Sequence, residues 1–121
     1  MARPPRILIV DDEEDLLEML KFEFEFQGFN VILSTGGDTA FATFQKEPVD
    51  VILSDIRMPN GDGISFLKKM KEFAPEIPFF FMSGYSENSE DDALALGAKA
   101  YFVKPFDLPE VVERINKTVN K

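Results

Sequence analysis

Five short runs of apolar residues recur along the chain, each bounded by charged or turn-forming residues. β-branched and aromatic side chains dominate these runs, and their apolar positions are largely continuous rather than alternating with polar ones. This pattern is typical of strands that are buried on both faces of a parallel sheet. It predicts strands over about residues 6–10, 30–34, 49–54, 77–82 and 100–103.

Segments of helical length separate the apolar runs. They predict helices over residues 13–27, 39–46, 65–73 and 87–96, and a fifth helix whose first turn contains Pro109. Asp38 and Asp107 are candidate N-caps, and Gly28 and Gly97 are natural stops. Because strand and helix alternate five times, we expect an α/β fold with helices on both faces of a parallel sheet.

The segment KFEFEFQGF, residues 21–29, carries two conflicting patterns. Its apolar and charged residues alternate as in a half-exposed strand, yet Leu20 and Phe24 continue a helical spacing. A helix therefore places Met19, Phe22 and Phe26 on a flank of the apolar stripe. We expect these three side chains to pack partly against a neighbouring helix, and a partner-binding patch is the alternative.

The composition narrows the chemistry available to the 121 residues, a length typical of one domain. Cysteine and histidine are absent, which excludes disulfides, thiolate nucleophiles, zinc-type imidazole sites and a histidine base. The net charge of −9 and the pI near 4.4 disfavour direct nucleic-acid binding by this chain. No apolar run approaches the ~20 residues of a membrane span, so we expect a cytoplasmic protein without membrane contacts.

Reactive side chains follow four of the five predicted strands. Asp11 and Asp12 follow the first strand, Asp55 the third, Ser83 the fourth and Lys104 the fifth. In an open α/β sheet the carboxyl ends of the strands form the ligand-binding edge, so these side chains should converge. Each has an ordinary alternative as a cap, a turn residue or a solvated charge, but their joint occurrence is not well explained that way.

Three more acids, Glu13, Glu14 and Asp15, follow directly after the first pair. Negative charge is stabilised at a helix N-terminus, and we assign these three acids to that role alone.

The converging groups suit phosphoryl chemistry with a hard cation. Clustered carboxylates without imidazole or thiolate ligands favour Mg²⁺, which would relieve the mutual repulsion of the acids. An ionised Asp55 is then a nucleophile toward phosphorus, forming an acyl phosphate. Lys104 would neutralise charge on the transferred group, and Ser83 would hydrogen-bond one of its oxygens.

Four motifs together resemble the response-regulator receiver domain (CheY-like) of two-component signalling. They are LIVDDEED, VILSDIRMPNGDG, FFFMSGYS and AKAYFVKPF, which span essentially the whole chain in order. The resemblance implies a flavodoxin-like (βα)5 fold, a three-layer sandwich whose parallel strands have the order 2-1-3-4-5. It also implies one receiver domain over residues 1–121 that accepts a phosphoryl group and switches conformation.

The resemblance implies a role for each matching residue of the acidic edge. Asp55 matches the phosphoacceptor. Asp12 matches a direct Mg²⁺ ligand, Asp11 binds the ion partly through water, and Arg57 supplies a backbone carbonyl.

The remaining matches concern the switch and the lifetime of the phosphoryl group. Ser83 and Lys104 match the conserved hydroxyl and lysine, with a cis peptide bond expected before Pro105. Tyr101 matches the aromatic switch residue, although packing at the strand end is its ordinary alternative. Arg57 and Tyr85 stand at variable positions, and as a bulky pair they should shield the phosphoryl group from water.

Partners follow from the same resemblance. It implies a sensor histidine kinase or phosphotransfer protein as donor and an output domain or partner as target. A homodimer through the last two helices and the strand between them is plausible, and both a stand-alone receiver and a piece of a longer protein fit the sequence.

Three alternative functions fit parts of the pattern. An aspartate-nucleophile phosphatase needs an acid two residues after Asp55, where this chain has Arg57. A flavin-binding module needs a hydroxyl- and glycine-rich loop after the first strand, where the acids repel phosphate. A receiver-like scaffold that is never phosphorylated stays open, although every reactive position is filled.

Overall fold

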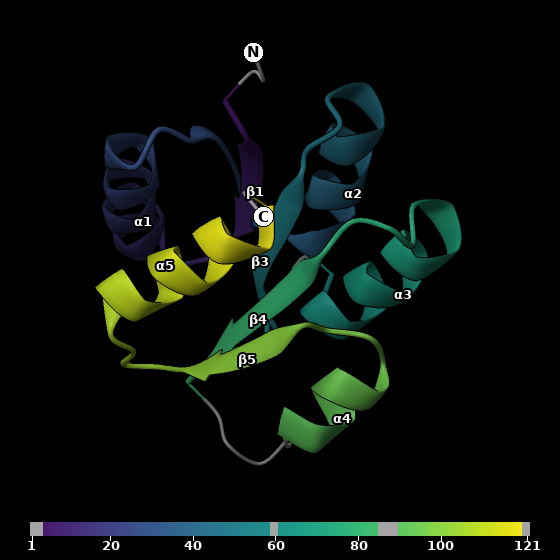
Figure 1. The fold of residues 1–121 in the computed structure, drawn as a ribbon. Helices are drawn as coiled ribbons and strands as arrows, with labels where there is room; N and C mark the ends of the chain where they lie inside the picture. Colours follow the sequence, from purple (N-terminus) through teal and green to yellow (C-terminus); the bar gives the residue numbers. More distant parts are fainter. Residues whose placement is uncertain (1–3, 59–60, 85–89, 120–121) are drawn as a thin grey trace.

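The computed structural model describes residues 4–58, 61–84 and 90–119. Within them strands and helices alternate, and the five strands pair in parallel in one sheet (Figure 1). The strands are β1 (Arg6–Val10), β2 (Asn30–Ser34), β3 (Val51–Asp55), β4 (Phe79–Ser83) and β5 (Ala100–Val103). Their order is β2-β1-β3-β4-β5, which confirms the predicted flavodoxin-like topology.

Helices cover both faces of the sheet (Figure 1). α1 (Glu14–Phe26) and α5 (Leu108–Val119) lie on one face. α2 (Gly37–Lys46), α3 (Gly63–Phe73) and α4 (Glu90–Ala95) lie on the other. The three-layer sandwich is therefore confirmed. Among the described residues, none of the helices combines the length and the apolar character that a membrane span requires.

The sheet divides the apolar interior into two clusters, because successive side chains of a strand point to opposite faces. In β1, Leu8 and Val10 belong to the cluster beneath α2, α3 and α4. Ile7 and Ile9 belong to the cluster beneath α1 and α5. Because all four are fully buried, the strand needs a continuous apolar run, and this explains the sequence pattern.

The apolar runs mark burial more accurately than they mark strand starts. β3 and β4 begin two residues later than predicted, at Val51 and Phe79. Val49 precedes β3 yet is only 3% exposed, and the Ile77 N–H donates to the carbonyl of Ala74 in a turn. Since a buried connection needs apolar side chains as much as a strand does, the two predicted starts are wrong.

α2 begins earlier than predicted, at Gly37, and the assignment of Asp38 as its N-cap is wrong. Gly36 is the N-cap, and Asp38 lies in the first turn with a carboxylate oxygen 3.5 Å from Lys69 Nζ. A Cβ at Gly37 would lie 2.8 Å from the carbonyl oxygen of Gly61, so this position needs glycine for close backbone approach. The capping preference of aspartate therefore predicts the wrong start for α2.

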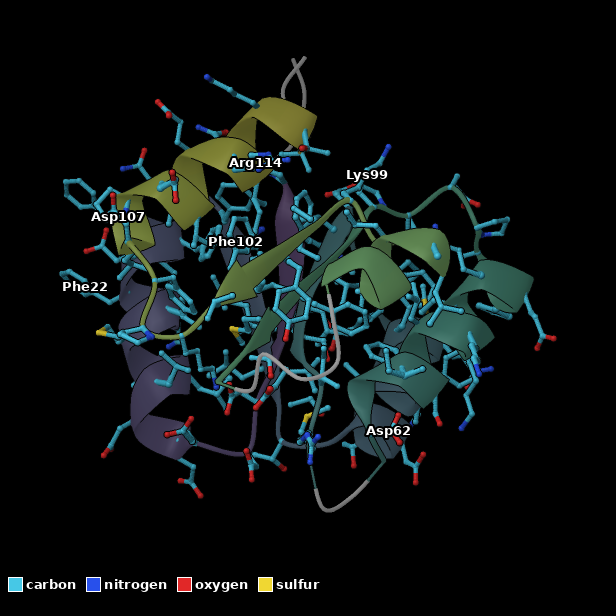
Figure 2. The ribbon with its side chains drawn as sticks, turned by 90° about the horizontal axis from the view of Figure 1, so that it is seen from below. Phe22, Asp62, Lys99, Phe102, Asp107 and Arg114 are labelled. Atoms are coloured by element: carbon cyan, nitrogen blue, oxygen red, sulfur yellow. The ribbon has the colours of Figure 1, made fainter. Side chains whose placement is uncertain are left out.

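The other helix ends follow local signals. α3 also begins two residues earlier than predicted, because Asp62 caps it by accepting the Ser65 N–H at 2.7 Å. Asp62 is labelled in Figure 2. α1 stops before Gly28 and α4 before Gly97, both with positive φ. The predicted start of the fourth helix, residues 87–89, lies outside the described residues.

The flank of α1 is more exposed than we expected. Met19, Phe22 and Phe26 are 49%, 69% and 77% exposed, and Phe22 projects at the periphery of the molecule (Figure 2). Phe22 and Phe26 line a groove whose other wall includes Pro109 and Val112 of α5. Packing against the neighbouring helix therefore covers only a minor part of the two phenyl rings.

Candidate functional site

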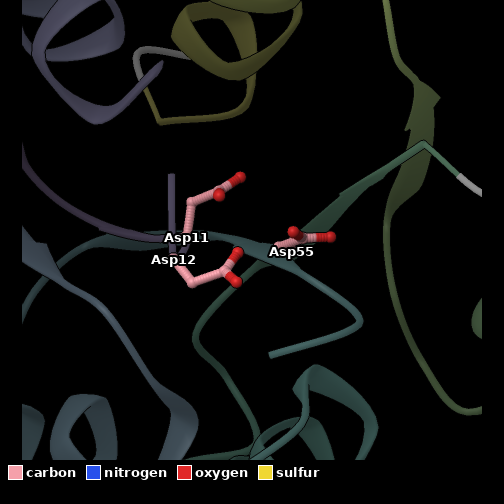
Figure 3. Close-up of side chains that lie close together, drawn as sticks. All are labelled: Asp11, Asp12 and Asp55. Carbon is pink, nitrogen blue, oxygen red and sulfur yellow. The ribbon is translucent and has the colours of Figure 1, made fainter. Parts of the chain in front are cut away.

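Three carboxylates meet at the carboxyl ends of β1 and β3. Val10 pairs with Ser54 in the parallel ladder, so Asp11 and Asp55 come to the same edge of the sheet. Each of Asp11, Asp12 and Asp55 offers a carboxylate oxygen, and these oxygens lie within 4.8 Å of one another (Figure 3). Asp11 and Asp55 are buried and Asp12 is exposed, so one side of the group is open to solvent.

Lys104 brings a cation to the buried side of the acids. It follows β5, and its side chain reaches past β4 to the ends of β3 and β1. Its Nζ atom lies 2.8 Å from Asp11 Oδ2, 3.1 Å from Glu13 Oε1 and 3.3 Å from Asp55 Oδ2. The peptide bond between Lys104 and Pro105 is cis, as the sequence resemblance implies.

The electrostatics of the site favour an additional cation. Burial raises the pKa of Asp11, and burial and the charge of Asp11 raise the pKa of Asp55. Burial alone would lower the pKa of Lys104, but hydrogen bonds to Asp11 and Glu13 raise it above its usual value. One firmly charged ammonium thus faces carboxylates whose ionised forms are destabilised, and a divalent ion would favour those forms.

The backbone around Asp55 fixes the orientation of its carboxylate. Its Oδ1 atom accepts the Ile56 N–H at 2.7 Å, which leaves Oδ2 toward Lys104. Behind it, the Gly63 N–H donates to the Ile56 carbonyl at 2.7 Å, and a Cβ at Gly63 would overlap the carbonyl oxygen of Asp55. The start of α3 therefore supports the acid at a distance that only glycine permits.

Ser83 and Lys104 are joined through their backbones. Ser83 ends β4 and is 1% exposed, and its carbonyl accepts the Lys104 N–H at 2.8 Å. Tyr101 lies three residues before Lys104 and is buried in the cluster on the α4 side of the sheet. This position agrees with packing at the strand end, and the role of Tyr101 as a switch stays a prediction.

Of the two residues expected to tune the lifetime of the phosphoryl group, the structure describes Arg57 and not Tyr85. Arg57 is exposed in the loop after β3, two residues beyond Asp55. Its roles, through the backbone carbonyl toward a metal and through the side chain toward the phosphoryl group, stay predictions. Tyr85 lies outside the described residues.

Glu13 is a site residue that the sequence does not single out. Glu14 and Asp15 lie in the first turn of α1, as predicted for acids that stabilise a helix N-terminus. Glu13 occupies the N-cap position but makes no side-chain capping bond, and contacts Lys104 instead. The neighbouring acids cannot be distinguished in the sequence. Only the fold shows which of them faces Lys104.

Comparison with known families decides the identity of the fold. A family model described as the response regulator receiver domain matches residues 7–116. The chain belongs to the response regulator receiver domain family. Receiver domains are parts of two-component signalling systems, and the resemblance of the chain to this family is confirmed.

Curated relatives of this receiver domain are regulators with additional sequence. The regulatory protein AtoC of Escherichia coli strain K12 is 44% identical over 107 residues, which are 88% of this chain and 23% of AtoC. The response regulator SaeR of Staphylococcus aureus is 34% identical over 116 residues, 95% of this chain and 50% of SaeR. The receiver domain thus spans half or less of these two relatives.

Solved receiver structures superimpose closely on this one. A CheY-like receiver protein from Methanospirillum hungatei JF-1 matches with a TM-score of 0.90 at 31% identity, covering 97% of this chain and 94% of that one. CheY in a CheX-CheY-BeF3-Mg²⁺ complex from Borrelia burgdorferi matches with a TM-score of 0.88 at 32% identity, covering 98% and 91%. The CheY-like fold is therefore shown.

Proposed function

We propose that this receiver domain accepts a phosphoryl group on Asp55 from the phosphohistidine of a sensor histidine kinase or phosphotransfer protein. The observation that carries the proposal is the position of the Asp55 carboxylate, between two further acids and Lys104. A related CheY was solved with beryllium fluoride and Mg²⁺, and it supports the same ligands here.

Mg²⁺ is the cofactor that the acidic edge fits. The donors that meet there are carboxylate oxygens from Asp11, Asp12 and Asp55. By its resemblance to receiver domains, the backbone carbonyl of Arg57 would add a further oxygen. Hard oxygen ligands with one solvent-exposed side suit an ion that keeps several waters. When bound, Mg²⁺ supplies positive charge beside the oxygens of the transferred group.

Phosphoryl transfer forms one bond to phosphorus and breaks another. An Asp55 oxygen forms a bond to phosphorus as the bond from phosphorus to the donor nitrogen breaks, and the electron pair stays on the imidazole. Lys104 neutralises charge on the phosphoryl oxygens, and the Ser83 hydroxyl donates to one of them. Arg57 and Tyr85 limit the access of water to the acyl phosphate.

The switch runs from Ser83 to the surface of α4, β5 and α5. Because the Lys104 N–H is bonded to the Ser83 carbonyl, a shift of Ser83 toward the phosphoryl group is passed to β5, which contains Tyr101. Leu94, Leu96 and Val103 expose 40%, 36% and 52% of their surface near this face. A partner, an output domain or a second copy would bind there, in the cytoplasm.

A small-molecule phosphodonor such as acetyl phosphate tests the proposal directly. We expect intact-mass measurement to show one added phosphoryl group in the presence of Mg²⁺, and none with EDTA or in Asp55→Asn. Equal modification of Asp55→Asn would contradict the assignment of the acceptor. An unmodified wild-type protein that also fails to bind beryllium fluoride would favour the scaffold that is never phosphorylated.

A further inference from the structure

Glu13 contacts the acidic edge twice, once through its backbone and once through its side chain. Its N–H donates to Asp11 Oδ1 at 2.8 Å, which turns the other oxygen of Asp11 toward Lys104. Its own carboxylate lies 3.1 Å from Lys104 Nζ. Since no side-chain capping bond competes for this carboxylate, the side chain of Glu13 is directed to the lysine.

The three carboxylates match the full donor capacity of Lys104. An ammonium group has three N–H donors, and Asp11, Glu13 and Asp55 each place one oxygen within hydrogen-bonding distance. A phosphoryl oxygen on Asp55 can therefore accept a hydrogen bond from Lys104 only through an N–H that already donates to one of these carboxylates. One of the three contacts must be given up or shared when the group arrives.

The contact with Glu13 is the least costly of the three to release. The Asp11 side chain is 0% exposed, and an unpaired carboxylate there would bear the full penalty of burial. Asp55 remains next to Lys104, because the phosphoryl group is attached to it. The Glu13 side chain is 64% exposed, so water solvates its carboxylate as soon as the lysine leaves.

We propose that Glu13 is a positioning residue that holds Lys104 in the unphosphorylated state and releases it to the phosphoryl group. This inference rests on the proposed function and adds a regulatory contact to it. Glu13 competes with the incoming phosphoryl oxygen for the ammonium of Lys104. It therefore destabilises the phosphorylated protein relative to the unphosphorylated protein.

The test compares Glu13→Gln, Glu13→Asp and Glu14→Gln by their affinity for beryllium fluoride at saturating Mg²⁺, measured by calorimetry. Glu13→Gln removes the charge, whereas Glu13→Asp keeps the charge and shortens the reach by one methylene. Glu14→Gln removes a neighbouring charge in the first turn of α1, for which no bond to Lys104 is found. Each variant is also titrated with Mg²⁺ alone.

We expect both Glu13 variants to bind beryllium fluoride about two- to fivefold more tightly, the ratio that corresponds to an ion pair with one exposed partner. Glu14→Gln should bind like the wild type.

If Glu13→Asp also binds like the wild type, charge rather than contact is responsible and the inference is wrong. It is equally wrong if Glu13→Gln weakens Mg²⁺ binding and leaves beryllium fluoride affinity unchanged, because Glu13 then serves the metal. Wild-type protein that binds no beryllium fluoride contradicts the proposed function itself.

Discussion

Asp11 Oδ2 and Lys104 Nζ lie 2.8 Å apart, although 93 positions separate the two residues along the chain. The contact joins the end of β1 to the residue after β5, across β3 and β4. The Asp11 side chain is 0% exposed, so water cannot solvate its carboxylate, and the ammonium of Lys104 balances its charge instead. The site and the stability of the fold therefore depend on the same ion pair.

Lys104→Met should destabilise the protein at neutral pH by about 3 kcal/mol, because it leaves two buried carboxylates facing each other. Lys69→Met is the matched control, since its pair with Asp38 is exposed on both sides, and we expect a change within about 0.5 kcal/mol. Urea unfolding measures both. Equal losses in the two variants would mean that the buried ion pair contributes no more to the free energy of unfolding than the exposed one.

Mg²⁺ should raise the melting temperature of the wild-type protein, because an ion that binds only the folded state stabilises it. Asp12→Ala removes a ligand from the open side of the acidic group and should weaken this dependence. Glu14→Ala should leave the dependence nearly intact, since Glu14 lies in the first turn of α1 and outside the acidic group. Thermal unfolding over a Mg²⁺ titration distinguishes the two, and a similar loss in both variants would argue against a defined site.

Asp55→Asn should stabilise the Mg²⁺-free protein at neutral pH. Burial and the charge of Asp11 raise the pKa of Asp55 above its reference value of 3.8, so the folded state binds its proton more tightly than the unfolded state. The stability that this proton contributes is fully present below pH 3.8 and is lost as pH rises through the folded-state pKa. Asp55→Asn has no carboxyl group to ionise at this position, so its stability does not fall in this way as pH rises.

The melting temperature of Asp55→Asn should therefore exceed that of the wild type by a few degrees at neutral pH, and the gap should close toward pH 3.8. Glu18→Gln, which changes an exposed acid of α1, controls for the general effect of removing one negative charge. A gap that is constant with pH would show that the raised pKa of Asp55 is not its cause.

The sheet and its reactive edge were predictable because both depend on local patterns. Strands buried on two faces require continuous apolar runs, and parallel pairing brings residues such as Asp55 and Lys104 to one edge. What the sequence does not predict depends on contacts between distant segments. Gly37 begins α2 because the backbone of Gly61 approaches it, and Glu13 faces Lys104 only once β1 and β5 are placed.

Arg57→Ala should shorten the lifetime of the acyl phosphate, since the bulky side chain two residues beyond Asp55 is expected to hinder attacking water. Tyr85→Ala should act in the same direction. Loss of the phosphoryl group after removal of the phosphodonor measures the rate, and Arg114→Ala, at an exposed position of α5, serves as the control. Rates that are unchanged or slower in both variants would contradict the shielding role.

Gly63→Ala should be strongly destabilising, because a Cβ at this position would overlap the carbonyl oxygen of Asp55 and lie 2.9 Å from Cε1 of Phe81. Neither the strand backbone nor a buried ring yields easily, so we expect a loss of about 3 kcal/mol or more and weaker Mg²⁺ binding. Gly84→Ala is the matched control, because a Cβ there would meet nothing within 4 Å. Urea unfolding and Mg²⁺ titration of the two variants separate the cases. If Gly63→Ala retains wild-type stability and Mg²⁺ affinity, the start of α3 does not support the carboxylate of Asp55.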